Sequence, residues 1–334
     1  MSVMLRQYSF TKPIGNAVKC NNLPPTQKSA EFSTMRMNVF LSHRSIQIFL
    51  PLFLLTVFCS PNTFAQASKA KSEPLCVMTY NLRFANNNPG EEWSKRRPLV
   101  RKVIEDVSPD VMGTQEGIWR QVRDLAADLK DYEWVGLGRD GGSHGEFMAV
   151  FYRRDRLEPI EFDHFWLSDT PSLMGSKTWG PTLARMVTWL RFRDLKTKQE
   201  FYFFNTHFDH QVQPAREKSA ALLRQRISTL DTNLPILLVG DFNAAADKNR
   251  AYHILTEDGF FADTWHTARE RKNEGIGTFN GFEAIRPNGP RIDWILARGK
   301  VAADKAEIVT YSQKRQFPSD HFPVVTRLTL GETK

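Results

Sequence analysis

Polar side chains that can bind a cation or carry a proton recur where apolar, strand-like runs of this chain end. Six such endings occur, and they hold the following groups: Asn81, Gln115-Glu116, His207-Phe208-Asp209, Asp241-Phe242-Asn243, Asp293 and Asp320-His321. Any single one could be an ordinary turn residue, because Asn and Asp are frequent in turns. Strands that share one core would gather all six at a common edge, and unpaired burial of so many ionisable groups is costly. A divalent cation with paired imidazoles would offset that cost, so the pattern indicates metal-assisted chemistry.

Cysteine usage restricts the ligands that such a cation could have. The chain of 334 residues contains three cysteines and no CxxC pair. Cys20 and Cys59 lie in the N-terminal 67 residues, which leaves Cys76 with no disulfide partner in the rest of the chain. Thiolate zinc sites are therefore excluded, and oxygen and imidazole ligands remain.

Strand-like runs alternate with helical patterns through the part of the chain that carries these groups. The spacing of apolar residues predicts helices over 91–107, 118–129 and 215–230. Strands are predicted at 75–80, 111–115, 147–152, 157–162, 186–192, 201–206, 236–239, 292–297, 308–311 and 324–330. This excess of strands predicts a mixed α/β fold with two sheets packed face to face and helices outside. Two Gly- and Asn-rich loops, 138–145 and 273–290, are expected at the rim of the site.

The N-terminal 67 residues have the features of a secretory signal. Residues 46–58 carry no charge, basic residues precede them, and small residues occupy the −3 and −1 positions of a cleavage site after Ala67. We expect removal of 1–67, a polar linker over 68–74, and a protein exported to the periplasm or the cell exterior. A buried core helix or an uncleaved anchor is the alternative, although a bilayer span takes roughly 20 residues. Translation from Met35 or Met37 would shorten the unusually long leading region.

The net charge of +8 is concentrated in this leading segment. Residues 1–67 hold six Lys and Arg and one acidic residue, whereas residues 68–334 hold 39 basic and 36 acidic residues, a net charge of +3. The length and the 41% of hydrophobic residues support a sizeable core and exclude a collagen, a disordered tail and a disulfide-stapled miniprotein. The nearly balanced remainder supplies no strong electrostatic footprint for long nucleic acid.

Seven short motifs resemble, in order, those of the endonuclease/exonuclease/phosphatase superfamily, whose members include DNase I, sphingomyelinases, deadenylases and inositol polyphosphate phosphatases. The motifs are YNLR (80–83), TQEG (114–117), GEFMAVFYR (145–153), NTHFDH (205–210), GDFN (240–243), RIDWI (291–295) and SDHFPV (319–324). They span nearly all of the chain after residue 74, and the likeness is closest to a secreted bacterial branch. The resemblance implies one domain over 75–331, folded like DNase I as a four-layered α/β/β/α sandwich of two mixed sheets.

The resemblance implies a metal site around Glu116, which matches the main metal ligand of the family. Asn81 and Asp320 match groups beside that metal, as ligands or as supports of the ligands. A hard carboxylate oxygen suits Mg²⁺, which proteins usually hold by one or two side chains together with water and substrate phosphate. The implied cofactor is therefore Mg²⁺, or Mn²⁺ in its place.

The resemblance also implies the groups that act on the phosphate. Asp241 matches the residue that orients or deprotonates the attacking water, and Asn243 can hydrogen-bond the phosphate or the nucleophile. His207 and His321 match the two imidazoles that flank the scissile phosphate, where they stabilise developing charge and assist proton transfer.

Three further residues are expected to support this centre. By position, Asp293 would pair with His321, and Glu146 would pair with His207. An exposed strand charge is the alternative for Glu146. Arg185, which precedes a strand, could clamp a phosphate with its planar guanidinium or form a surface ion pair instead.

These residues together predict a secreted phosphoesterase that cleaves phosphodiester bonds, with DNA or RNA as the favoured substrate. The dipeptide Thr206-His207 resembles the DNase I, sphingomyelinase and deadenylase side of the superfamily and not apurinic-site endonucleases. A phospholipid and a sugar or inositol phosphate are the alternative substrates. A catalytically silent binding module on the same scaffold is the alternative outside enzymes, since a fold alone does not imply activity. We expect a monomer with no stable protein partner.

Overall fold

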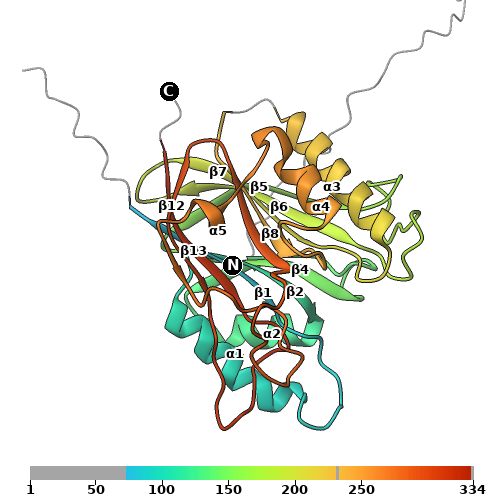
Figure 1. Cartoon of the computed structure of the whole chain (residues 1–334), viewed down its shortest axis with the longest axis vertical. Helices are drawn as coiled ribbons and strands as arrows, with labels where there is room; N and C mark the ends of the chain where they lie inside the picture. Colours follow the sequence, from blue (N-terminus) through green and yellow to red (C-terminus); the bar gives the residue numbers. More distant parts are fainter. Residues whose placement is uncertain (1–72, 231–232, 332–334) are drawn as a thin grey trace, which may run out of the picture. The chain divides into compact units, whose positions relative to one another are not determined.

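The protein, described over residues 73–230 and 233–331 by a computed structural model, contains two packed β-sheets (Figure 1). The first sheet has the order β10 (Glu270–Lys272), β12 (Val301–Ile308), β13 (Val324–Leu330), β1 (Leu75–Asn81), β2 (Val111–Ile118), β4 (Glu146–Arg153) and β3 (Tyr132–Val135). The second has the order β5 (Leu157–Trp166), β6 (Met186–Asp194), β7 (Glu200–His207), β8 (Ile236–Asp241), β11 (Asp293–Arg298) and β9 (Ala262–Asp263). Both are mixed, because β1 and β2 run parallel, as do β7 and β8, among antiparallel neighbours.

Helices cover the outer face of each sheet. They are α1 (Trp93–Val107), α2 (Trp119–Asp128), α3 (Gln213–Ser228) and α4 (Arg250–Thr256), with a 3₁₀ turn η1 (Glu257–Gly259) after α4. The short helix α5 (Thr264–Thr267) instead contacts β11 of the second sheet and β12 of the first. Figure 1 shows α1 and α2 against the first sheet and α3 and α4 against the second. None of the helices in the described ranges is both long and apolar enough to cross a membrane. The expected signal segment 1–67 and the linker up to residue 72 lie outside the described residues.

Alternation of side chains along the strands builds three apolar layers. Val77 of β1 and Phe203 of β7 point between the sheets, where they join one buried cluster. Met78, the next residue of β1, points the other way and packs under α1 and α2. Phe204 points away from the first sheet and packs under α3 and α4. The predicted four-layered α/β/β/α sandwich is confirmed.

The structure differs from the predicted elements at several places, of which the strand at 308–311 and helix α4 are examples. The strand expected at 308–311 is wrong, because β12 covers Val301–Ile308 instead. That segment, VAADKAEI, is poor in β-branched and aromatic residues, and its pairing with β13 over most of its length holds it in the sheet. Helix α4 was not predicted, since its seven residues are too few to show a helical period.

A buried polar network joins the two sheets directly beneath the strand ends. Asn205 of β7 donates its amide to the carbonyls of Thr114 and Ala149 in the other sheet, at 2.9 and 3.0 Å. Its oxygen accepts a hydrogen bond of 2.7 Å from Nε2 of Gln115. Gly113 makes room for this contact, because a Cβ there would lie 2.6 Å from Oδ1 of Asn205. These hydrogen bonds join the two sheets and restrain the neighbouring Glu116 relative to His207, although Oε1 of Gln115 has no hydrogen-bond partner among the described residues.

Candidate active site

The strand ends of the two sheets meet at one edge of the sandwich. In the second sheet, His207 is paired with Asp241, and Asp241 is paired with Asp293, so these three residues stand side by side on β7, β8 and β11. In the first sheet, Asn81 at the end of β1 is paired with Gln115, which precedes Glu116. Nδ2 of Asn81 donates to Oδ2 of Asp241 and to Oε1 of Glu116, both at 2.9 Å. The amide of Asn81 therefore connects the two sheets at this edge.

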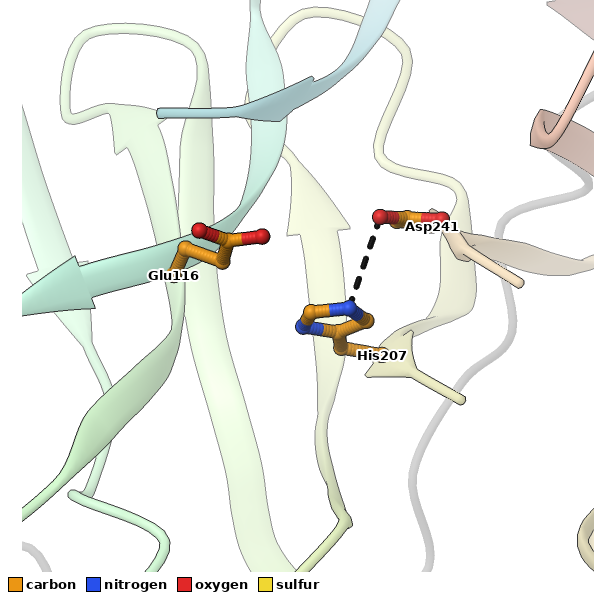
Figure 2. A group of neighbouring side chains, drawn as sticks. All are labelled: Glu116, His207 and Asp241. Carbon is orange, nitrogen blue, oxygen red and sulfur yellow. Dashed lines mark ion pairs between the residues drawn. The ribbon is translucent and has the colours of Figure 1, made fainter. Parts of the chain in front are cut away.

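Glu116 is directed into the site by an irregularity in β2. The register of β2 against β4 shifts between Thr114 and Gly117, and Glu116 has a φ of 62°, which is unusual for a residue other than glycine. Its Oε2 accepts a hydrogen bond of 3.2 Å from the backbone N–H of Phe84. In Figure 2 the carboxylate of Glu116 faces the imidazole of His207 and the carboxylate of Asp241.

A single oxygen, Oδ2 of Asp241, lies at the centre of the site. In addition to its hydrogen bond from Asn81, it lies 3.4 Å from Nε2 of His207 and 3.8 Å from Nε2 of His321. Asp241 is 1% exposed. Burial, and next the charge of Asp293, raise the pKa of Asp241 to about 7, against the influence of His321 and of the hydrogen bonds from Asn243 and Asn81. Such a carboxylate can accept a proton near neutral pH.

Carboxylates surround His321 and favour its protonated form. Its Nδ1 lies 3.0 Å from Oδ2 of Asp293, which is the pairing expected from the sequence. Burial by itself would lower the pKa of His321, but the charges of Asp293 and Asp241 outweigh burial and raise it well above its ordinary value. The ring packs edge-on against Phe279, which fixes its orientation.

His207 has the opposite electrostatics and is held by Asn243. Its Nε2 lies 2.9 Å from Nδ2 of Asn243, whose backbone adopts the left-handed region (φ 48°) that Asn tolerates. Burial, followed by the positive charges of Arg185 and Arg139, lowers the pKa of His207 well below its ordinary value. His207 is therefore neutral where His321 is protonated, and the two imidazoles differ in what they can do.

The expected pairing of Glu146 with His207 is wrong. Glu146 forms an ion pair with Nη1 of Arg139 at 2.7 Å, while Nδ1 of His207 is buried without a hydrogen-bond partner among the described residues. The loop that contains Arg139 folds back, and the backbone N–H of Arg139 donates to the carbonyl of Glu146. This backbone contact places the guanidinium of Arg139 beside the carboxylate of Glu146, so His207 is not its partner. Burial raises the pKa of Glu146 to about 7 despite the charge of Arg139.

Arg185 is buried beside this centre and not at the surface. Its side chain is 5% exposed, its Nη2 lies 3.0 Å from Nδ1 of His210, and its Nε lies 3.6 Å from Asp209. Its Nε and Nη1 have no hydrogen-bond partner within the described part of the chain. A buried guanidinium with free donors fits an anionic substrate group, as the phosphate-clamp interpretation requires.

The donor set fits a hard divalent cation. Ligand atoms of Glu116, His207 and Asp241 all lie within 4.8 Å of one another, as do those of Asp241, Asp293 and His321. Oδ1 of Asp293 is buried and has no hydrogen-bond partner in the described ranges. Carboxylate oxygens are the ligands that Mg²⁺ and Mn²⁺ accept. The side chain of Glu116 is 13% exposed, whereas that of Asp241 is 1% exposed. A cation bound by Glu116 would therefore be accessible to a substrate from solvent.

Asn81 and Asp320 take different positions around Glu116. The oxygen of Asn81 accepts a hydrogen bond of 2.9 Å from the backbone N–H of Arg83, so its amide NH₂ supports the two carboxylates. Asp320 lies with its Oδ2 3.6 Å from Nε of Arg83, which also approaches Glu116. Burial, and the negative charge of Glu116, raise the pKa of Asp320, opposed by His321 and Arg83.

Comparison with known proteins agrees with this geometry. The model of the endonuclease/exonuclease/phosphatase family matches residues 78–321, which include all the site residues from Asn81 to His321. The chain belongs to this family. It is a hydrolase of phosphoester bonds, of a family that depends on divalent metals, and the carboxylates and the imidazole of His207 could hold one.

Two solved structures from Bacteroides thetaiotaomicron are similar to the chain over nearly their full length. One is an endonuclease/exonuclease/phosphatase family protein with 33% identity and a TM-score of 0.73, aligned over 78% of this chain and 99% of that one. The other is a mannosyl-6-phosphatase with 35% identity and a TM-score of 0.72, aligned over 76% and 99%. A protein of Acanthamoeba polyphaga mimivirus is 28% identical over 192 residues, which are 54% of this chain and 70% of that protein.

Three arginines of the site were not predicted from the sequence. Arg83 belongs to the YNLR motif and Arg139 to the Gly-rich loop 138–145. Neither sequence context indicates that the arginine side chain points into the site. Arg96 lies on helix α1, whose sequence has an amphipathic pattern that would place an arginine on the exposed face. Its guanidinium is instead buried and donates to the carbonyls of Leu82 and Pro318. A charged residue on the buried face of α1 was the signal that could have revealed it.

Proposed function

We propose that this phosphoesterase uses Asp241 to activate the attacking water, with Mg²⁺ or Mn²⁺ held at Glu116. The observation that carries the proposal is the single carboxylate oxygen of Asp241 that faces Asn81, His207 and His321. A cation bound at Glu116 would polarise the phosphate and stabilise the charge that develops on it. No other arrangement of charged groups in the described residues combines a carboxylate, two imidazoles with pKa values shifted in opposite directions and a buried guanidinium that has unpaired donors.

The residues of the chain divide the reaction between them. Asp241 accepts the proton of a water as the water oxygen attacks phosphorus, and Asn243 orients the groups around it. The P–O bond to the leaving group breaks, and the imidazolium of His321, held by Asp293, supplies a proton to the departing oxygen. Neutral His207 and the guanidinium of Arg185 contact the phosphate oxygens, which stabilises the transition state electrostatically.

We propose a sugar phosphomonoester as the substrate class. The similarity to a mannosyl-6-phosphatase supports this choice, as does the nearly balanced charge of residues 68–334. Nuclease action on DNA or RNA, favoured from the sequence motifs, is the second candidate because the Thr206-His207 dipeptide resembles that of nucleases and deadenylases.

The substrate proposal is tested by measuring released phosphate from mannose 6-phosphate and glucose 6-phosphate, beside cleavage of bis-(p-nitrophenyl) phosphate, DNA and RNA. We expect the sugar phosphates to give the highest kcat/KM with Mg²⁺ or Mn²⁺ present. EDTA should reduce every rate to background, and added Mg²⁺ should restore it. Faster cleavage of DNA or RNA would establish the nuclease instead, and binding without turnover of any substrate would favour a silent binding module.

We also propose that the protein acts as a monomer. Separately, we propose that residues 1–67 direct export and are then removed. The uncharged run 46–58 and the small residues that end at Ala67 support this. Mass spectrometry of the protein secreted by an expressing bacterium should find Ser68 at the N-terminus. A full-length chain that stays in the cytoplasm would contradict the proposal.

A further inference from the structure

The guanidinium of Arg83 lies among the carboxylates that would hold the metal. Its nitrogens are 3.9 Å from Oε2 of Glu116, 3.6 Å from Oδ2 of Asp320 and 3.6 Å from Oε2 of Glu91. The two contacts to Glu116 and Asp320 are too long for hydrogen bonds, and Nε of Arg83 has no hydrogen-bond partner within the described residues. Arg83 therefore neutralises Glu116 and Asp320 without being bonded to them, and its side chain, 27% exposed, can also reach a ligand.

The backbone holds Arg83 in this place. Its φ of 53° puts a residue other than glycine in the left-handed region, which is unfavourable unless the surroundings impose it. Three hydrogen bonds impose it: the N–H of Arg83 donates to Asn81, and its carbonyl accepts from Nη2 of Arg96 and Nε2 of Gln121, all at 2.9 Å. The residue is fixed against the segment of Asn81, although its guanidinium forms no hydrogen bond with Glu116 or Asp320.

A cation bound at Glu116 would meet the positive charge of Arg83 across a few ångströms. At that separation two like charges near a protein surface repel by a few kcal/mol before screening. A phosphate group between them would attract both, since an arginine fork and a divalent cation both bind phosphate oxygens. The same side chain would thus oppose the cation alone and favour the cation together with phosphate.

We propose that Arg83 couples metal binding to substrate binding, so that the divalent cation binds tightly only together with a phosphate group. The inference deepens the proposed function and rests on it, because it assumes that the cation and the phosphate meet at Glu116. Coupling of this kind is reciprocal, so the cation raises the affinity for phosphate by the same factor.

The test is calorimetric titration of the full chain with Mg²⁺, with and without inorganic phosphate, for the wild type and for Arg83→Ala. We expect phosphate to tighten Mg²⁺ binding to the wild type by about five-fold or more. In Arg83→Ala, Mg²⁺ alone should bind about three- to ten-fold more tightly than in the wild type, because the competing charge is gone. The effect of phosphate should fall below about two-fold, and Arg83→Lys should restore part of it.

Arg97→Ala is the matched control, because Arg97 is similarly exposed and pairs with Asp124 and Asp128 on the helical surface. It should titrate like the wild type. If Arg83→Ala does not fold by circular dichroism, Arg83→Gln replaces it, since Gln keeps a polar side chain without the charge. The proposal would be overturned if the neutral variant, without phosphate, bound Mg²⁺ no more tightly than the wild type does. The titrations measure binding and do not depend on turnover. If the protein did not hydrolyse sugar phosphates, the substrate proposal would be wrong, but the effect of phosphate on Mg²⁺ binding could still be measured.

Discussion

Asp241→Asn is expected to lower kcat by about 10²–10⁴-fold, the usual contribution of a positioned general base. The substitution keeps the shape of the side chain and an oxygen that can accept from Asn81, at the loss of the hydrogen bond from the backbone N–H of Asn243. It removes the carboxylate that takes the proton of the water. The measurement is the rate of phosphate release under saturating substrate and Mg²⁺.

The variant should still fold, because the ionised form of the buried Asp241 carboxylate destabilises the folded state. Burial raises the pKa of Asp241 from 3.8 to about 7, so the folded state binds this proton more tightly than the unfolded state. Stability from this group is therefore present at low pH and is lost as the pH rises through the range from about 4 to 7. Without metal, the Tm of Asp241→Asn relative to that of the wild type should therefore rise between pH 5 and pH 8.

A second buried aspartate supplies the comparison. Asp194 is 2% exposed and accepts two hydrogen bonds from Arg156, at the end of β6 opposite the site. Asp194→Asn should lower the Tm and leave kcat unchanged. A wild-type rate for Asp241→Asn would show that another group activates the water.

The strand ends could be predicted because a period of two residues fixes which side chains face the core. Val239 in the core places Asp241, two residues later, on the same face of β8. The pairing of Asp293 with His321 followed from the family resemblance, and the strand register then sets Asp293 beside Asp241. Local patterning and the order of the motifs were sufficient for this part of the site.

The remaining contacts depend on backbone geometry that local patterns do not encode. The left-handed conformation of Glu116 accompanies a shift in register between β2 and β4, whose paired residues there are 30 or more positions apart in the sequence. The choice of Arg139 over His207 as the partner of Glu146 depends on how the loop 138–145 folds back. The position of Arg83 depends on Arg96 and Gln121, which belong to two different helices. Such contacts arise from packing, and a single sequence shows only that the residues are available.

Asp293→Asn is expected to lower kcat by about 10²-fold or more and to move the whole pH profile of activity to lower pH. The loss of rate follows from His321, whose ring would lose the carboxylate that orients it and holds its proton. Since the charge of Asp293 opposes burial and keeps the pKa of His321 high, its removal lowers that pKa. Activity that needs protonated His321 would then be lost at a lower pH on the alkaline side.

The acidic side of the profile should move in the same direction for a different reason. After burial, the charge of Asp293 is the largest influence that raises the pKa of Asp241, so Asp293→Asn lowers the pKa of the base as well. Both limbs of a kcat/KM profile in the presence of Mg²⁺ should therefore shift to lower pH together. In a His321→Gln background, adding Asp293→Asn should lower kcat little further, because Asp293 supports the acid only through His321. An alkaline limb that stays in place in Asp293→Asn would show that His321 does not act as the acid, and would leave Asp241 as the only titrating group of the mechanism.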